Sequence, residues 1–143
     1  MSICIDLAPD AVEHPFADMM ARLLRQNLDD HPEKVDVAKR MSGRVAIVVT
    51  DLDFAVTLTC SRGRITFHSG IAGVPDVTIR APSEWISKMS LVEMTNGRIR
   101  FPDPRGPVAK EIAAAEREGL IKTHASPASM LLVLRLTEVL SIN

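Results

Sequence analysis

The C-terminal run, residues 127–142 (PASMLLVLRLTEVLSI), carries more apolar surface than one buried helix face requires. Helical spacing places one group of its residues on a single arc wide enough to pack against a sheet or another helix. These residues are Leu132, Val133, Leu136, Val139 and Leu140. Outside that arc lie Met130, Leu131, Leu134 and Ile142. This surplus must contact more protein, a second subunit or an apolar ligand. The run is shorter than the roughly 20 apolar residues that cross a bilayer, so we expect no stable membrane insertion.

Length and charge restrict the function further. A chain of 143 residues is expected to form one domain, residues 1–143, with 1–13 as a poorly patterned lead-in. A net charge of −1, one Trp and no Tyr argue against binding to nucleic acid. Cys4 and Cys60 are far apart and the N-terminus has no secretory pattern. These features favour a reducing, cytoplasmic location.

Periodicity predicts the order of helices and strands. Apolar residues at helical spacing predict an amphipathic helix over 14–30 and a short one over 35–41. Alternating β-branched residues then predict strands and one buried sheet face. The strands are expected over 44–50, 54–60, 64–69 and 76–80, as an antiparallel meander. Helical spacing returns at 83–89, a further strand is expected at 98–101, and Pro107 favours a helix to Glu118. Residues 120–124 are expected to add a short strand before the last helix.

No motif predicts catalysis, and we expect no catalytic residue, metal or cofactor. Cys60 shares a face with apolar residues, where a thiol is normally inert, so a Cys60–His68 pair is a weak hypothesis. The four histidines are scattered without ligand spacing. A solvated strand edge is the simpler interpretation of one arginine set, and a basic rim for an anionic headgroup is the alternative. That set is Arg44, Arg98, Arg100 and Arg105.

The order of these elements resembles the sterol carrier protein family, of the type-two, nonspecific lipid-transfer kind. The closest local likeness is Val74–Met89 (VPDVTIRAPSEWISKM), a strand that enters a capped helix. The likeness covers residues 14–101 and 120–142, and residues 102–119 depart from it. The C-terminus also lacks the peroxisomal tripeptide of the eukaryotic members.

This resemblance implies an α+β fold. We expect a five-stranded, mostly antiparallel sheet packed against helices, with an inserted helix near 104–119. The family further implies an apolar tunnel between sheet and helices that holds sterols, fatty acids or acyl-CoA without a chemical step. The residues expected to line it come from the sheet, the following helix and the last helix. They are Phe67, Val77, Ile79, Trp85, Ile86, Met89, Leu132, Leu136 and Leu140. Plain core packing is an equal alternative for each of them.

Three functions follow from these observations. The first is non-catalytic binding or transfer of a lipid-like molecule, such as a fatty acyl chain, a sterol or an isoprenoid, in an internal apolar cavity. The second is a non-enzymatic subunit that uses its apolar C-terminal helix as a homodimer or partner-protein interface. A small enzyme that uses Cys60, His68 or Asp76 ranks last.

Overall fold

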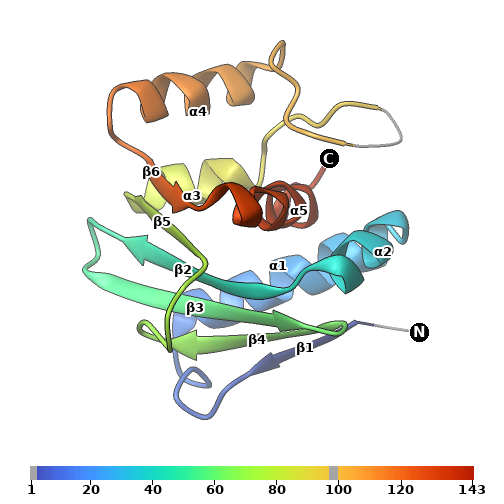
Figure 1. Cartoon of the computed structure of the whole chain (residues 1–143), viewed down its shortest axis with the longest axis vertical. Coiled ribbons are helices and arrows are strands. Elements are labelled where there is room, and N and C mark those ends of the chain that lie inside the picture. Colours follow the sequence, from blue (N-terminus) through green and yellow to red (C-terminus); the bar gives the residue numbers. More distant parts are fainter. Residues whose placement is uncertain (1–2, 97–99) are drawn as a thin grey trace.

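A computed structural model describes residues 3–96 and 100–143 and folds them into one mixed sheet with helices on one face (Figure 1). In chain order the elements are β1 (Cys4–Leu7), α1 (Pro15–Asp30), α2 (Glu33–Arg40), β2 (Gly43–Val49), β3 (Phe54–Ser61), β4 (Arg64–Ser69), β5 (Val77–Ala81), α3 (Ser83–Met89), α4 (Pro107–Arg117), β6 (Lys122–Ala125), a 3₁₀ turn (Pro127–Ser129) and α5 (Met130–Leu140). The strand order across the sheet is β1-β4-β3-β2-β5-β6. The predicted α+β class is confirmed.

Strands β2, β3 and β4 form the predicted antiparallel meander. Their alternating side chains bury one face, and Val45, Leu58 and Phe67 on that face have no exposed surface. The turn between β3 and β4 places Arg62 at φ 50° and Gly63 at φ 80°. Two consecutive positive φ angles are typical of a two-residue hairpin turn whose twist matches the strands.

The placement of β5 corrects the prediction of a four-stranded meander. β5 pairs with β2, and the two strands run parallel. Residues 70–76 carry the chain back across the sheet, because polar contacts hold them on its outer face. The Thr57 hydroxyl donates to the Gly70 carbonyl (2.7 Å) and accepts from the Ala72 N–H (3.0 Å). A Gly- and Pro-rich run therefore acts here as a crossover, not as a hairpin turn.

The lead-in segment is also corrected, because β1 lies within residues 1–13. β1 pairs in parallel with β4, from Cys4 opposite Arg64 to Leu7 opposite Phe67. The sheet therefore has six strands instead of five. The expected short strand at 120–124 is present as β6, antiparallel to β5. Of the expected strand at 98–101, residues 98 and 99 lie outside the described residues, and Arg100 and Phe101 belong to no strand.

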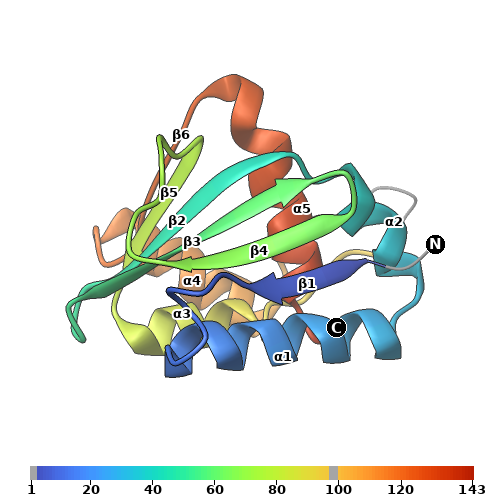
Figure 2. The ribbon, with the colours of Figure 1, turned by 90° about the horizontal axis from the view of Figure 1, so that it is seen from below.

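The main core lies between the inner sheet face and the helices α1, α2 and α5. Figure 2 shows α1 running alongside the sheet and α5 crossing behind its strands. Leu24 of α1 and Leu136 of α5 are 0% and 1% exposed. Burying a leucine side chain contributes about 1.5–3 kcal/mol, so these two contacts strongly favour the observed docking of both helices. Within the described parts of the chain, no helix combines the length and apolar character that crossing a bilayer requires.

Side chains from the end of α1 and from α2 hold the C-terminal end of α5. The buried Asn27 amide donates to the carbonyls of Val139 and Leu140, each at 2.9 Å. The Lys34 ammonium, which has no exposed surface, donates to the Ser141 carbonyl. Burial lowers the pKa of Lys34 from its ordinary value. The last carbonyls of α5, which no helix residue can pair, thus obtain donors from residues over a hundred positions earlier.

Candidate functional site

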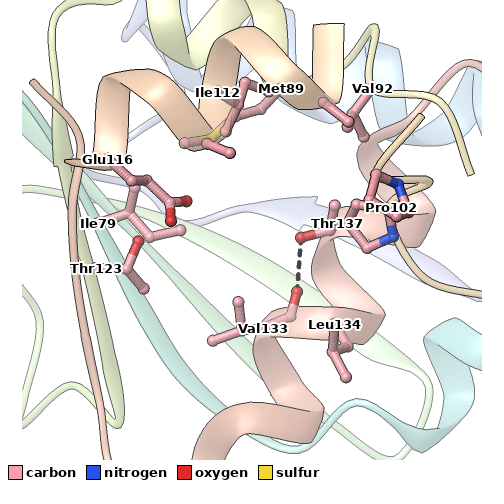
Figure 3. A pocket seen from close by; sticks show the side chains of 13 residues that line it. Ile79, Met89, Val92, Pro102, Ile112, Glu116, Thr123, Val133, Leu134 and Thr137 are labelled. Atoms are coloured by element: carbon pink, nitrogen blue, oxygen red, sulfur yellow. Dashed lines mark hydrogen bonds between the residues drawn. The ribbon is translucent and has the colours of Figure 1, made fainter. Parts of the chain in front are cut away.

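An apolar cavity of about 350 Å³ lies beneath α4 (Figure 3). Its walls come from β5, β6, α3, α4, α5 and the segment that joins α3 to α4. The lining residues are Ile79, Met89, Val92, Pro102, Pro104, Ala109, Ile112, Ala113, Glu116, Thr123, Val133, Leu134 and Thr137. Ligand pockets in proteins usually measure about 300–1,000 Å³ and are mostly apolar, so this cavity has the size and lining of a small ligand site.

Helix α4 forms the roof of the cavity, and polar contacts fix its position. The Glu93 carboxylate accepts from the backbone N–H groups of Val108 and Ala109, each at 3.0 Å, and so caps the N-terminal end of α4. Burial alone would raise the pKa of Glu93, but these two hydrogen bonds lower it overall. A Cβ at Gly106 would come within 2.2–2.7 Å of the Glu93 side chain, so a larger residue there would force Glu93 to shift. A Lys88–Glu111 ion pair of 2.7 Å also joins α3 to α4.

Helix α5 contributes different sides to the core and to the cavity. Leu132 and Leu136 pack into the core, whereas Val133, Leu134 and Thr137 line the cavity. The Thr137 hydroxyl donates to the Val133 carbonyl (2.8 Å), so this donor is satisfied within the helix (Figure 3). The surplus apolar surface of the helix is therefore partly explained: some of it faces a hollow.

Glu116 is the one ionisable side chain among the residues that the structure places around this cavity. It comes from the last turn of α4, and Figure 3 shows its carboxyl group directed into the cavity. Burial raises the pKa of Glu116 from its ordinary value. The residue as a whole is exposed, so its carboxyl group lies at the rim. The site can thus hold an apolar body and offers Glu116 and Thr123 as polar contacts.

Two of the nine residues predicted to line a ligand site, Ile79 and Met89, lie in the cavity wall. Five others pack in the core or against it: Phe67, Val77, Trp85, Leu132 and Leu136. The remaining two, Ile86 and Leu140, line a smaller hollow of about 210 Å³ beside α1. Contact of any of the nine with a ligand stays a prediction.

Sequence reasoning did not assign the residues of 102–104 and α4 to the site. The sequence does indicate that this segment has an apolar face to bury, because Pro107 and the spacing of Val108 and Ile112 predict an amphipathic helix there. The resemblance to the sterol carrier proteins marks that helix as an insertion and gives it no place at the ligand site. The structure places its apolar residues Ala109 and Ile112 on the cavity.

The residues considered for catalysis are separated. Cys60 lies on the inner face of β3, opposite Ile65, whereas His68 lies on the outer face of β4, opposite Thr57. Burial raises the pKa of the Cys60 thiol to about 12, so it carries no thiolate at neutral pH. Asp76 accepts from the Arg44 N–H (2.9 Å), which is a structural contact. Within residues 3–96 and 100–143, no three potential metal-binding side chains gather.

Comparison with known proteins gives one matching family and several solved structures that share the fold of this chain. The model of the SCP-2 sterol transfer family matches residues 20–101, and no curated protein matches the sequence. UbiJ-SCP2, a ubiquinone synthesis protein, superposes with a TM-score of 0.59 at 14% identity, covering 87% of this chain and 90% of that protein. The sterol carrier protein domain 2 of Helicoverpa armigera gives 0.54 at 16% identity, with 87% and 84% covered. A crystal structure of sterol carrier protein 2 gives 0.51 at 16% identity, with 87% and 92% covered. At these identities the structures establish the fold alone.

Proposed function

This chain belongs to the SCP-2 sterol transfer family, and on that premise we propose that it binds a lipid-like molecule in the cavity beneath α4. The observation that carries the proposal is an apolar space of about 350 Å³ whose lining includes a single ionisable group, Glu116. Fatty acyl chains, sterols and isoprenoids are the ligand classes. The role is binding or transfer without a chemical step, supported by the separation of Cys60 from His68.

Such a cavity can hold a ligand with few polar anchors. Each buried methylene contributes about 0.8 kcal/mol, so about ten of them contribute roughly 8 kcal/mol. Loss of translational and rotational freedom opposes binding by about 4 kcal/mol or more. A cost near the lower end of the range of about 4–15 kcal/mol leaves a net gain from burial, which requires that Val133, Leu134 and Ile112 remain in contact with the ligand.

Displacement of a fluorescent fatty acid by palmitate, cholesterol and a ubiquinone analogue tests this proposal. Native mass spectrometry of the purified protein adds a direct search for a co-purifying lipid. We expect Val133→Phe to weaken binding about tenfold, because the ring occupies space worth one or two methylenes of contact. Met130→Phe, on the same helix but 46% exposed and outside the cavity lining, is the matched control. Failure of every ligand class to bind, or equal losses in both variants, would contradict the proposal.

A partner-protein or homodimer interface on α5 is the second candidate function. Leu131 is 56% exposed, and Met130 and Ile142 are also exposed, which is apolar surface that association would cover. Sedimentation velocity distinguishes the two functions, because a tight dimer that binds no lipid would favour the interface. A cytoplasmic location is likewise our proposal, and the free thiols of Cys4 and Cys60 support it.

A further inference from the structure

A second hollow, which we call the arginine groove, lies between α2 and α5. It measures about 240 Å³ and is lined by Val37, Arg40, Arg100, Leu131, Leu134, Arg135 and Glu138. Leu134 lines both this groove and the cavity beneath α4. The two spaces are therefore neighbours on adjacent sides of α5.

Backbone carbonyls hold two of the three guanidinium groups. Arg135 Nη1 donates to the Arg40 carbonyl (2.8 Å). Arg100 donates from Nε to the Thr95 carbonyl and from Nη2 to the Asn143 carbonyl, both at 3.0 Å. A guanidinium carries five N–H donors, so each group keeps donors for an anion. Arg100 and Arg135 are half-buried and so already oriented before an anion arrives.

The groove concentrates positive charge on a chain whose net charge is −1. Its one carboxylate among the described lining residues is Glu138, which is buried and faces the Lys34 and Arg100 charges. Across residues 3–96 and 100–143, no ion pair involves Arg40, Arg100 or Arg135. Of the four arginines that the sequence suggests as a basic rim, Arg100 lines the groove and Arg98 lies outside the described residues. The other two are elsewhere: Arg44 lies against Gly73, and Arg105 pairs with Asp103.

We propose that the arginine groove docks on the phosphate groups of an anionic lipid bilayer, with Leu131 and Leu134 facing the apolar side of the headgroup layer. Arginines bind phosphates through several donors, and exposed aliphatic side chains between basic residues suit a membrane surface. Docking places Leu134, and so the cavity, at the bilayer. This extension rests on the proposed function, because it gives a bound lipid a route between bilayer and cavity.

Two other occupants fit the groove less well. A second copy in a two-fold dimer would bring the three arginines of one groove against those of the other, which is repulsive. A soluble phosphate compound would use the arginines but would leave Leu131, at 56% exposure, uncovered. A bilayer offers phosphates to the arginines and an apolar layer that covers the leucines.

Vesicle cosedimentation tests the proposal, with phosphatidylcholine alone and with an equal mixture of phosphatidylcholine and phosphatidylglycerol. The groove variant is Arg40→Gln/Arg135→Gln. Its control, Arg22→Gln/Arg62→Gln, removes the same charge from exposed positions of α1 and the β3–β4 turn. We expect the wild type to bind the mixed vesicles, and the groove variant to bind them about 25-fold more weakly, at about fivefold per arginine. The control is expected to bind like the wild type.

Arg40→Gln alone is a second variant that should fold normally, because it keeps the backbone carbonyl of residue 40 to which Arg135 donates. Its affinity for the mixed vesicles should be about fivefold lower than that of the wild type. Equal losses in groove variant and control, equal binding to both vesicles, or binding of soluble glycerol phosphate without vesicle binding would overturn the proposal. The proposal would also be overturned if the wild type were a dimer and the groove variant a monomer. Lipid displacement without vesicles should be unchanged in the groove variant. The two proposals can fail separately. If the wild type displaces no lipid probe, and the groove variant alone loses vesicle binding, the cavity proposal fails and the docking proposal stands.

Discussion

The two sides of α5 face different environments. On one side, Leu136 and Val139 contact the sheet and α1 with almost no exposed surface. On the other side, Val133 and Leu134 face a hollow roofed by α4. Figure 1 shows α4 set apart from the sheet, with α3 and α5 between them. The same helix thus completes a solid core and one wall of a cavity.

The difference follows from how each side is built. The core side packs a continuous strand face, where paired strands keep neighbouring side chains in register and fill the space. The cavity side is completed by α3, α4 and an irregular segment around Pro102, which the strand pairing does not bring together. The family match covers residues 20–101 and so ends before most of this second region. Ligand selectivity is expected to reside in that less regular part.

The largest expected effect is a difference in stability between alanine variants of two leucines in α5. Leu136→Ala should lower the free energy of unfolding by about 2–5 kcal/mol, because it leaves a void in a filled core. Leu134→Ala should cost less than about 1 kcal/mol, since Leu134 is 36% exposed and already borders a hollow. Urea unfolding measures both values. Equal costs would mean that the cavity side is packed like the core.

Adding volume should produce the same contrast at a smaller scale. Val139→Phe is expected to cost about 1–3 kcal/mol, because the core has no room for a ring. Val133→Phe should change stability by less than about 0.5 kcal/mol, because the ring enters the cavity. Thermal unfolding of the two variants, with far-UV circular dichroism to confirm helix content, gives the comparison. A similar loss from Val133→Phe would argue that α4 closes directly on α5.

The smallest expected effect concerns Glu116 at the cavity rim. Burial raises its pKa above the ordinary 4.5, so the folded protein binds a proton more tightly than the unfolded chain. The stability it contributes is therefore present below pH 4.5 and is lost as the pH rises through the raised pKa. Above that pKa a charge faces the cavity, and affinity for an uncharged lipid probe should fall by only about twofold, since Glu116 is exposed at the rim and water screens the charge.

Glu116→Gln should remove this pH dependence of lipid affinity, measured by probe displacement between acid and neutral pH. Glu118→Gln, which follows α4 and does not line the cavity, is the control and should keep the wild-type profile. A profile that Glu116→Gln leaves unchanged would show that another group titrates.

Local patterns were sufficient for most of the fold. The alternation of Phe54, Val56 and Leu58 predicts β3 because neighbours in the chain decide it, and the helical spacing of α1 works in the same way. β1 was missed because four residues carry too little pattern, and its pairing with β4 joins positions about sixty residues apart. The parallel placement of β5 depends on hydrogen bonds to Thr57 and Arg44, which no local rule encodes.

The site was less predictable than the fold. Apolar periodicity indicates that Phe67 and Leu136 are covered, but it cannot distinguish a side chain that meets another from one that meets a void. The cavity exists because the Glu93 cap and the Lys88–Glu111 ion pair hold α4 in place. Those contacts join residues 15 to 23 positions apart and leave no periodic trace in the sequence.

The amide of Asn27 and the ammonium of Lys34 donate hydrogen bonds to carbonyls at the end of α5, which lie more than a hundred residues later in the sequence. During synthesis these groups emerge from the ribosome long before their acceptors exist. The part of the apolar face of α1 that α5 covers therefore stays uncovered until translation has passed Ser141. Completion of the domain, and of any lipid-binding space within it, is an event that follows translation of that residue.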